Sequence, residues 1–200
     1  MPTFELQSPD LTVALVLTLE DGALQYAVTK SGVEAVALSP LGLKLADADL
    51  SEGLTFVADE RGSVDEAYRI PAFKKAVCEN RANTLSLSLR KGNHTLVVEA
   101  RAYDDGAAVR LRVPGEGEAA VVDETTGYRV PQTAGEIYAM KHLFTYEDQV
   151  HLIPFGELTQ NRLAFPVLVQ ADRDTWALYT EAAVFGDYGG ANVLAAPDDP

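Results

Sequence analysis

Residues Leu85–Val113 have the sequence LSLSLRKGNHTLVVEARAYDDGAAVRLRV, and their pattern indicates the fold class. Its leucines first alternate with serines, and its later apolar residues alternate with glutamate and arginine. Such alternation is typical of half-buried strands, because successive side chains in a strand point to opposite faces. The turn residues Lys91-Gly92-Asn93 and Asp104-Asp105-Gly106 divide the stretch into segments. The sequence therefore predicts an antiparallel meander of three strands.

The same alternation recurs nearer the N-terminus. Residues 11–19 and 24–28 both alternate, and the hairpin signal Asp21-Gly22 separates them. In the first of these strands, every second residue is apolar and is expected on one packed face: Leu11, Val13, Leu15, Leu17 and Leu19.

A further hairpin is predicted from residues 165–170 and 175–180, and helical periodicity is nearly absent throughout. Many short strands with regular turn signals favour an all-β fold, a large antiparallel β-sandwich. At 200 residues the chain is long enough for one such domain. We expect a single β-sandwich domain over residues 1–194, with residues 195–200 as a tail or the start of a linker.

Composition excludes several classes of partner. Thirty acidic against sixteen basic residues give a net charge of −14, which argues against nucleic acid and anionic lipid, since both are bound through Lys and Arg. The sequence contains no apolar run long enough for a membrane helix, so no membrane partner is expected. Residues 1–7 have neither the basic region nor the apolar core of a signal peptide. The single cysteine, Cys78, excludes an internal disulfide.

Residues that could carry chemistry are few. The sequence contains no dinucleotide-binding glycine motif, no P-loop, no H-E-x-x-H and no G-x-S-x-G nucleophile elbow. His142 and His151 flank an acidic segment around Glu147, so two histidines and a carboxylate could hold a metal ion. The favoured interpretation is that they are polar loop residues on the rim of a sandwich, because this spacing carries little information. His94 follows a turn and is expected to be solvated.

Two glutamates and the only tryptophan stand out from their surroundings. Glu147 follows aromatic residues, and Glu181 lies at the end of a predicted strand, where ligand-binding groups often lie. Trp176 alternates with Leu178 in the same strand. We interpret Trp176 as a core residue rather than a platform for a sugar ring.

Six blocks of sequence, in order, carry a resemblance to a known family. They resemble the N-terminal domain of glycoside hydrolase family 97, the α-glucosidase and α-galactosidase family, over nearly the whole chain. The blocks are Leu6–Asp10 with Asp21-Gly22, Ser39–Leu43, Asp65–Pro71 with Asn83–Leu85, Arg101–Arg110, Tyr146-Glu147, and Thr180–Ala183 with Asp187–Gly190.

The resemblance implies a sandwich of the galactose mutarotase type that packs on a catalytic (β/α)8 barrel. The catalytic acid and its partner lie in that barrel, so no catalytic residue is expected in this chain. Calcium in the full-length enzyme is held mainly by glutamates, one of them from the N-terminal domain. By motif position that ligand matches Glu147, and Glu181 is a candidate for substrate binding. Calcium needs six to eight oxygen ligands, so no tight calcium site is expected in this chain alone.

The resemblance also bears on assembly and location. It implies a secreted or periplasmic enzyme. If strands of the family's sandwich are missing, an exposed edge or barrel-facing patch would result, and a homodimer would cover it.

Three functions follow from the residues and the resemblance. The first is a non-catalytic accessory domain of a family 97-type glycoside hydrolase, inactive alone and contributing to a carbohydrate and calcium site. The second is a stand-alone carbohydrate-binding module. The third is a sugar epimerase, for which His142 or His151 with Glu147 or Glu181 is the candidate acid–base set.

Overall fold

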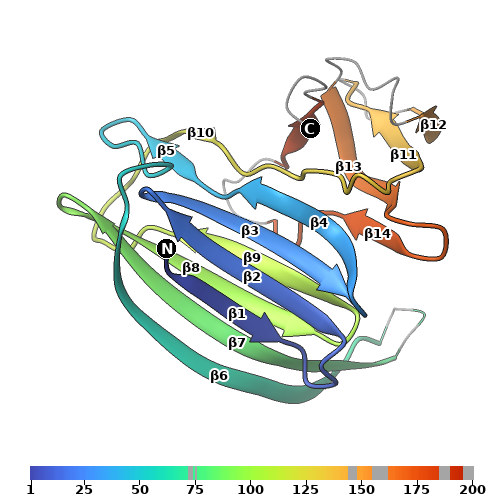
Figure 1. The fold of residues 1–200 in the computed structure, drawn as a ribbon, viewed down its shortest axis with the longest axis horizontal. Coiled ribbons are helices and arrows are strands. Elements are labelled where there is room, and N and C mark those ends of the chain that lie inside the picture. Colours follow the sequence, from blue (N-terminus) through green and yellow to red (C-terminus); the bar gives the residue numbers. More distant parts are fainter. Residues whose placement is uncertain (72–73, 75, 144–147, 155–161, 185–189, 196–200) are drawn as a thin grey trace. The chain divides into compact units, whose positions relative to one another are not determined.

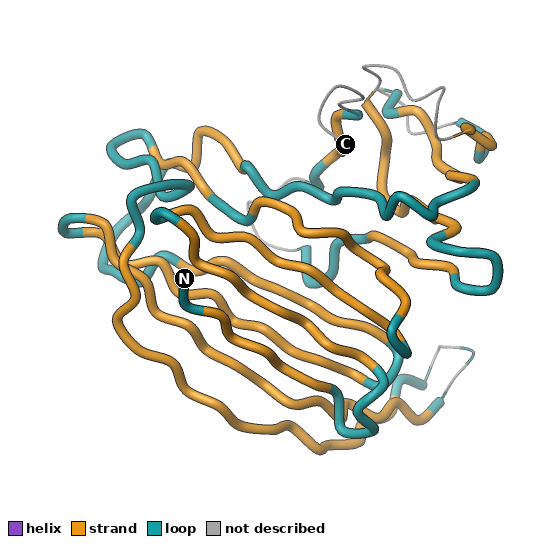
Figure 2. The backbone as a smooth tube through the Cα atoms, in the orientation of Figure 1, coloured by secondary structure: helices purple, strands orange, loops and turns teal. Residues whose placement is uncertain are grey.

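The chain folds into β-strands joined by turns and loops. The structure is a computed structural model that describes residues 1–71, 74, 76–143, 148–154, 162–184 and 190–195. No described residue is helical (Figure 2). The strands are β1 (Thr3–Gln7), β2 (Val13–Glu20), β3 (Ala23–Lys30), β4 (Val33–Pro40), β5 (Leu43–Leu45), β6 (Thr55–Arg69), β7 (Val77–Lys91), β8 (His94–Tyr103), β9 (Gly106–Arg112), β10 (Val121–Glu124), β11 (Glu136–Lys141), β12 (His151–Pro154), β13 (Arg162–Gln170), β14 (Trp176–Tyr179) and β15 (Asn192–Leu194).

The chain divides into two compact units. Unit 1 comprises Met1–Tyr128 and unit 2 comprises Arg129–Pro200. The single domain expected over residues 1–194 stays a prediction. Of the expected tail, Ala195 is buried and residues 196–200 lie outside the described residues.

Unit 1 is a sandwich of two four-stranded antiparallel sheets. One sheet has the strand order β1-β2-β3-β4 and the other β6-β7-β8-β9 (Figure 1). β1 contacts β7 and β8 across the interior, and β2 contacts β8 and β9. The predicted meander is confirmed, because β7 pairs with β8 and β8 pairs with β9 in antiparallel register. The prediction of an all-β sandwich is likewise confirmed.

The core of unit 1 is built from the alternate apolar residues of its strands. Leu15 and Leu17 of β2 are fully buried, as are Leu87 and Leu89 of β7. Leu11 was expected on the same buried face, but it is 71% exposed. The strand begins only at Val13, because Leu11 has a positive φ of 63° and belongs to the preceding turn.

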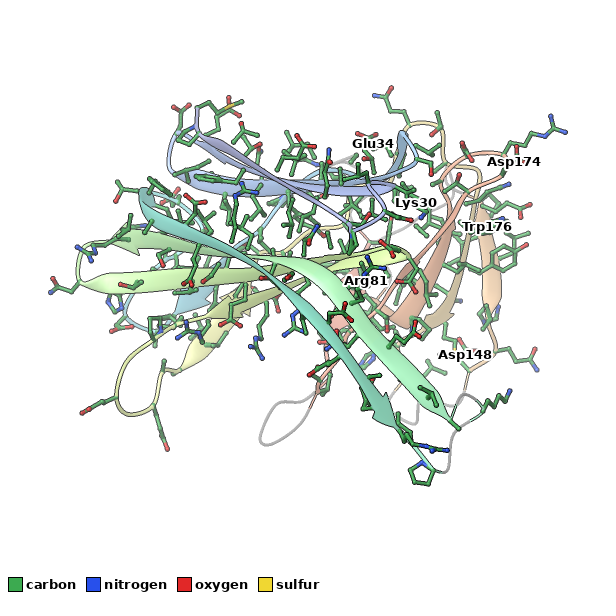
Figure 3. All side chains as sticks on the ribbon, turned by 90° about the horizontal axis from the view of Figure 1, so that it is seen from below. Lys30, Glu34, Arg81, Asp148, Asp174 and Trp176 are labelled. Atoms are coloured by element: carbon green, nitrogen blue, oxygen red, sulfur yellow. The ribbon has the colours of Figure 1, made fainter. Side chains whose placement is uncertain are left out.

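One of the two longest strands of unit 1 was not predicted from the sequence. β6 runs over fifteen residues as the edge of its sheet, and its side chains are exposed or half-buried. β8 ends its pairing with β7 at Ala82, so β7 residues before Ala82 pair with β6 alone. The two strands thus continue past the sandwich as a two-stranded arm (Figure 3).

Unit 2 is built on one antiparallel sheet with the order β12-β11-β13-β14, to which β15 adds by pairing with β13. The predicted hairpin is confirmed, since Leu168 of β13 lies opposite Leu178 of β14. Side chains on one face of this sheet are buried, namely Ile137, Ala139, Val167, Val169 and Tyr179. None of the described segments is a helix able to cross a membrane.

Candidate functional site

Most of the residues singled out from the sequence belong to unit 2. His142, His151, Trp176 and Glu181 are described there. Glu147, the candidate calcium ligand, lies outside the described residues. His94 belongs to unit 1, where its Nε2 lies 3.7 Å from a carboxylate oxygen of Asp47.

His151 forms a pair with Asp148 at the start of β12. The Nε2 atom of His151 lies 3.0 Å from Oδ1 of Asp148, and the backbone N–H of Lys141 donates a 3.0 Å hydrogen bond to Oδ2. Asp148 therefore joins the end of β11 to the start of β12. The hydrogen bond with His151 lowers the pKa of Asp148, and the backbone N–H groups of Lys141 and Gln149 act in the same direction.

The carboxylate of Glu181 is engaged with the backbone. Its Oε2 accepts a 2.7 Å hydrogen bond from the N–H of Ala191. Glu181 follows β14 and Ala191 precedes β15, so this contact fixes where the chain returns to the sheet. A role for Glu181 in substrate binding stays a prediction.

Trp176 does not lie in the core, and that interpretation of the sequence is wrong. Its side chain is 45% exposed, and its ring centroid lies 5.8 Å from that of Tyr138 at an interplanar angle of 51°. The Tyr138 hydroxyl donates a 2.9 Å hydrogen bond to Glu136. This bond raises the pKa of Tyr138. Trp176 and Tyr179 lie on opposite faces of the sheet. Tyr179 lies on the buried face, and Trp176 is therefore exposed.

The feature that sequence reasoning missed is the face on which Trp176 lies. Opposite residues in antiparallel strands share a face, and Tyr138 lies opposite both Leu152 and Leu168. Leu168 in turn lies opposite Leu178. The signal was present as alternation in β11 and β14, but alternation alone does not tell which face is covered.

A self-contained metal centre does not fit the described residues. They contain no group of three or more histidine, cysteine or acidic side chains that could hold a metal ion. Calcium prefers six to eight oxygen ligands. The described part of the chain thus offers no calcium cage of its own, and the suggested site from two histidines and a carboxylate stays a prediction, because Glu147 lies outside the described residues.

Comparison with known proteins gives one family. The family model described as "Glycosyl-hydrolase 97 N-terminal" matches residues 6–199. A probable retaining alpha-galactosidase from Streptomyces bingchenggensis is 28% identical over 181 residues, and the match covers 90% of this chain and 28% of that protein. A retaining alpha-galactosidase from Bacteroides thetaiotaomicron is 28% identical over 192 residues, again covering 90% of this chain and 28% of that protein.

Solved structures share the fold. A beta-arabinopyranosidase superposes with a TM-score of 0.80 at 23% identity, over 88% of this chain and 31% of that one. A glycoside hydrolase family 97 enzyme from Pseudoalteromonas sp. strain K8, in complex with panose, gives a TM-score of 0.83 at 18% identity, over 96% of this chain and 30% of that one. The chain therefore spans less than a third of the length of these relatives.

Proposed function

Because the chain belongs to the glycosyl-hydrolase 97 N-terminal family, we propose that it is a non-catalytic β-sandwich domain that packs on a catalytic (β/α)8 barrel. In full-length enzymes of this family the N-terminal domain sits with such a barrel. The family match over residues 6–199 carries the proposal.

The same proposal assigns the domain a share in a carbohydrate and calcium site. Glu147 would supply one oxygen ligand to calcium, and the catalytic domain would supply the others. Support comes from the ligand chemistry, because a glutamate oxygen suits a hard cation and one glutamate cannot hold it alone. Bound calcium would present a positive charge to the hydroxyl groups of a sugar.

The test combines this chain with the catalytic domain of the Bacteroides thetaiotaomicron retaining alpha-galactosidase, produced without its own N-terminal domain. Each component is assayed alone and in mixture with nitrophenyl α-galactoside. We expect no turnover by the chain alone and a complex detectable by calorimetry. Turnover by the chain alone, or failure to bind at millimolar concentration, would overthrow the proposal.

A carbohydrate-binding module is the second candidate, and the exposure of Trp176 is the observation that favours it. Exposed tryptophan rings are apolar surfaces on which a sugar ring can stack. Calorimetric titration with maltose and with galactose separates the two functions. Binding to the isolated chain tighter than millimolar favours the module.

A further inference from the structure

The unit 2 sheet carries an apolar face whose members are exposed or half-buried in the described structure. We call it the outer face and define it by Tyr138, Met140, Leu152, Leu168, Trp176 and Leu178. Leu152 is 49% exposed and Leu178 is 58% exposed. The outer face crosses β12, β11, β13 and β14, because Tyr138 lies opposite Leu152 and Leu168, and Leu168 lies opposite Leu178. Met140 and Trp176 each lie two residues along the strand from one of these members, Met140 from Tyr138 and Trp176 from Leu178.

The outer face differs from the rest of the protein surface in charge. The chain carries a net charge of −14, whereas the six side chains that define the outer face are uncharged at neutral pH, and the carboxylate beside them on the same face is that of Glu136, two residues before Tyr138 in β11. The neighbouring carboxylate of Glu136 accepts the hydroxyl of Tyr138. Aromatic residues and methionine with few charges are the composition of the buried centre of protein interfaces. Exposed apolar patches of this kind mark interaction sites.

The position of β15 indicates from which sheet the rest of the polypeptide begins in the relatives. β15 pairs with β13, the strand that carries Leu168, and Leu194 of β15 lies opposite Arg162. The matched region is the N-terminal part of the family's enzymes and less than a third of their length. In those relatives the remaining polypeptide therefore follows the strand equivalent to β15, on the sheet that bears this face.

We propose that the outer face is the surface of this domain that docks the catalytic domain. The proposal rests on the proposed function and specifies its interface. A sugar fits the outer face less well, because its two rings are tilted by 51° and four of its six side chains are aliphatic or thioether. A second copy of the chain would bring two net charges of −14 together, which opposes association.

The single tryptophan of the chain makes the test direct. Trp176 is the only tryptophan in the sequence, so chain labelled with 5-fluorotryptophan gives one ¹⁹F resonance, and that resonance reports on the outer face. The labelled chain is titrated with the unlabelled catalytic domain of the Bacteroides thetaiotaomicron retaining alpha-galactosidase. Calorimetry measures binding independently. Concentrations reach the millimolar range, because that is the effective concentration that a short linker gives to a tethered domain.

We expect the Trp176 resonance to shift or broaden in step with binding. Leu178→Ser should weaken binding at least ~10-fold, because docking would bury this exposed leucine, and fully burying a leucine side chain is worth at least the free energy of a tenfold change in affinity. Leu38→Ser is the matched control, since Leu38 is an exposed leucine of unit 1 and its substitution should leave affinity unchanged.

The other outcomes separate the inference from the proposed function. Binding with an unchanged Trp176 resonance, or equal affinity in both variants, overturns the docking face and leaves the proposed function standing. Absence of binding overturns both. If maltose or galactose shifts the resonance, the outer face binds a sugar. If raising the concentration of the chain alone shifts it, the outer face binds a second copy. Either result overturns the inference.

Discussion

The backbone N–H of Asp10 donates a 2.9 Å hydrogen bond to Oδ1 of Asp104, which lies 94 residues further along the chain. Asp10 belongs to the turn between β1 and β2, and Asp104 to the turn between β8 and β9. The contact therefore ties the two sheets of unit 1 together at one end. The Asp10 carboxylate accepts hydrogen bonds from Ser8 Oγ at 2.7 Å and from the N–H of Thr12 at 2.9 Å.

Acid should weaken the hydrogen bonds that the Asp10 carboxylate accepts in this turn. The hydrogen bonds from Ser8 and then from Thr12 hold the pKa of Asp10 well below its usual range. A carboxyl whose pKa is lower in the folded than in the unfolded chain stabilises the fold above the unfolded pKa of ~3.9, and this stability is lost as pH falls below about 5. We expect Asp10→Asn to lower stability at pH 7 and to reduce the loss of stability between pH 7 and pH 3.

Urea unfolding at pH 7, 5 and 3 measures this effect. Asp105→Asn, in the turn that also holds Asp104, is the control and should keep the pH dependence of the unmodified chain. An Asp10→Asn variant that loses as much stability on acidification as the unmodified chain would contradict the assignment.

Two glycines in hairpin turns allow the cost of a left-handed backbone conformation to be measured separately from the cost of a steric clash. Gly22 and Gly32 have φ values of +82° and +83°. A Cβ atom on Gly22 would lie 2.8 Å from the Cα and N atoms of Gly53, whereas nothing lies within 4 Å of one on Gly32. Gly32→Ala should cost about 1 kcal/mol for the left-handed conformation alone. Gly22→Ala should cost at least ~1 kcal/mol more, because it must also displace backbone.

Denaturant unfolding of both alanine variants gives the two free energies directly. Equal losses would mean that the approach of Gly53 to Gly22 is not maintained in solution. Since Leu54 N–H donates a 2.9 Å hydrogen bond to the carbonyl of Gly22, the larger loss should be accompanied by faster exchange of the Leu54 amide.

The meander and the hairpin were predictable because their apolar residues alternate and their turns contain Gly and Asp. β6 was not, because every side chain from Thr55 to Ser63 is exposed and no alternation exists to detect. An edge strand is stabilised by hydrogen bonds to its neighbour, here β7. Backbone pairing of this kind is weakly reflected in the strand's own amino-acid composition. Trp176 was misjudged for a related reason. Alternation places Trp176 and Tyr179 on opposite faces, but only the three-dimensional structure shows which face is covered.

Glu99 of β8 is the centre of a surface ion-pair cluster. Arg110 contacts its Oε2, and Nε of Arg112 lies 2.9 Å from its Oε1. The hydrogen bond from Arg110 contributes most to lowering the pKa of Glu99. Because both arginines are at least half exposed, Glu99→Gln should cost no more than about 1 kcal/mol at low salt.

The salt dependence of the stability lost in Glu99→Gln distinguishes the ion pairs of Glu99 from its packing. In 1 M NaCl the Debye length falls to about 3 Å, so the difference between Glu99→Gln and the unmodified chain should shrink. Glu60→Gln, on the exposed edge strand β6, is the control and should change stability little in either condition. A loss from Glu99→Gln that stays the same between about 0.05 and 1 M NaCl, over which the Debye length falls roughly four- to fivefold, would assign the effect to packing.

Isomeric side chains on the two faces of the unit 2 sheet test whether its outer face is free in the isolated chain. Ile137 is 1% exposed and Leu178 is 58% exposed. Ile137→Ala should lower the free energy of unfolding by about 2–5 kcal/mol, because it removes buried methyl and methylene groups and leaves a cavity. Leu178→Ala should change it by no more than about 0.5 kcal/mol, since its side chain is mostly in water already. Thermal and urea unfolding measure both. A Leu178→Ala loss as large as that of Ile137→Ala would mean that the outer face is packed within the chain itself, and it could then dock nothing else.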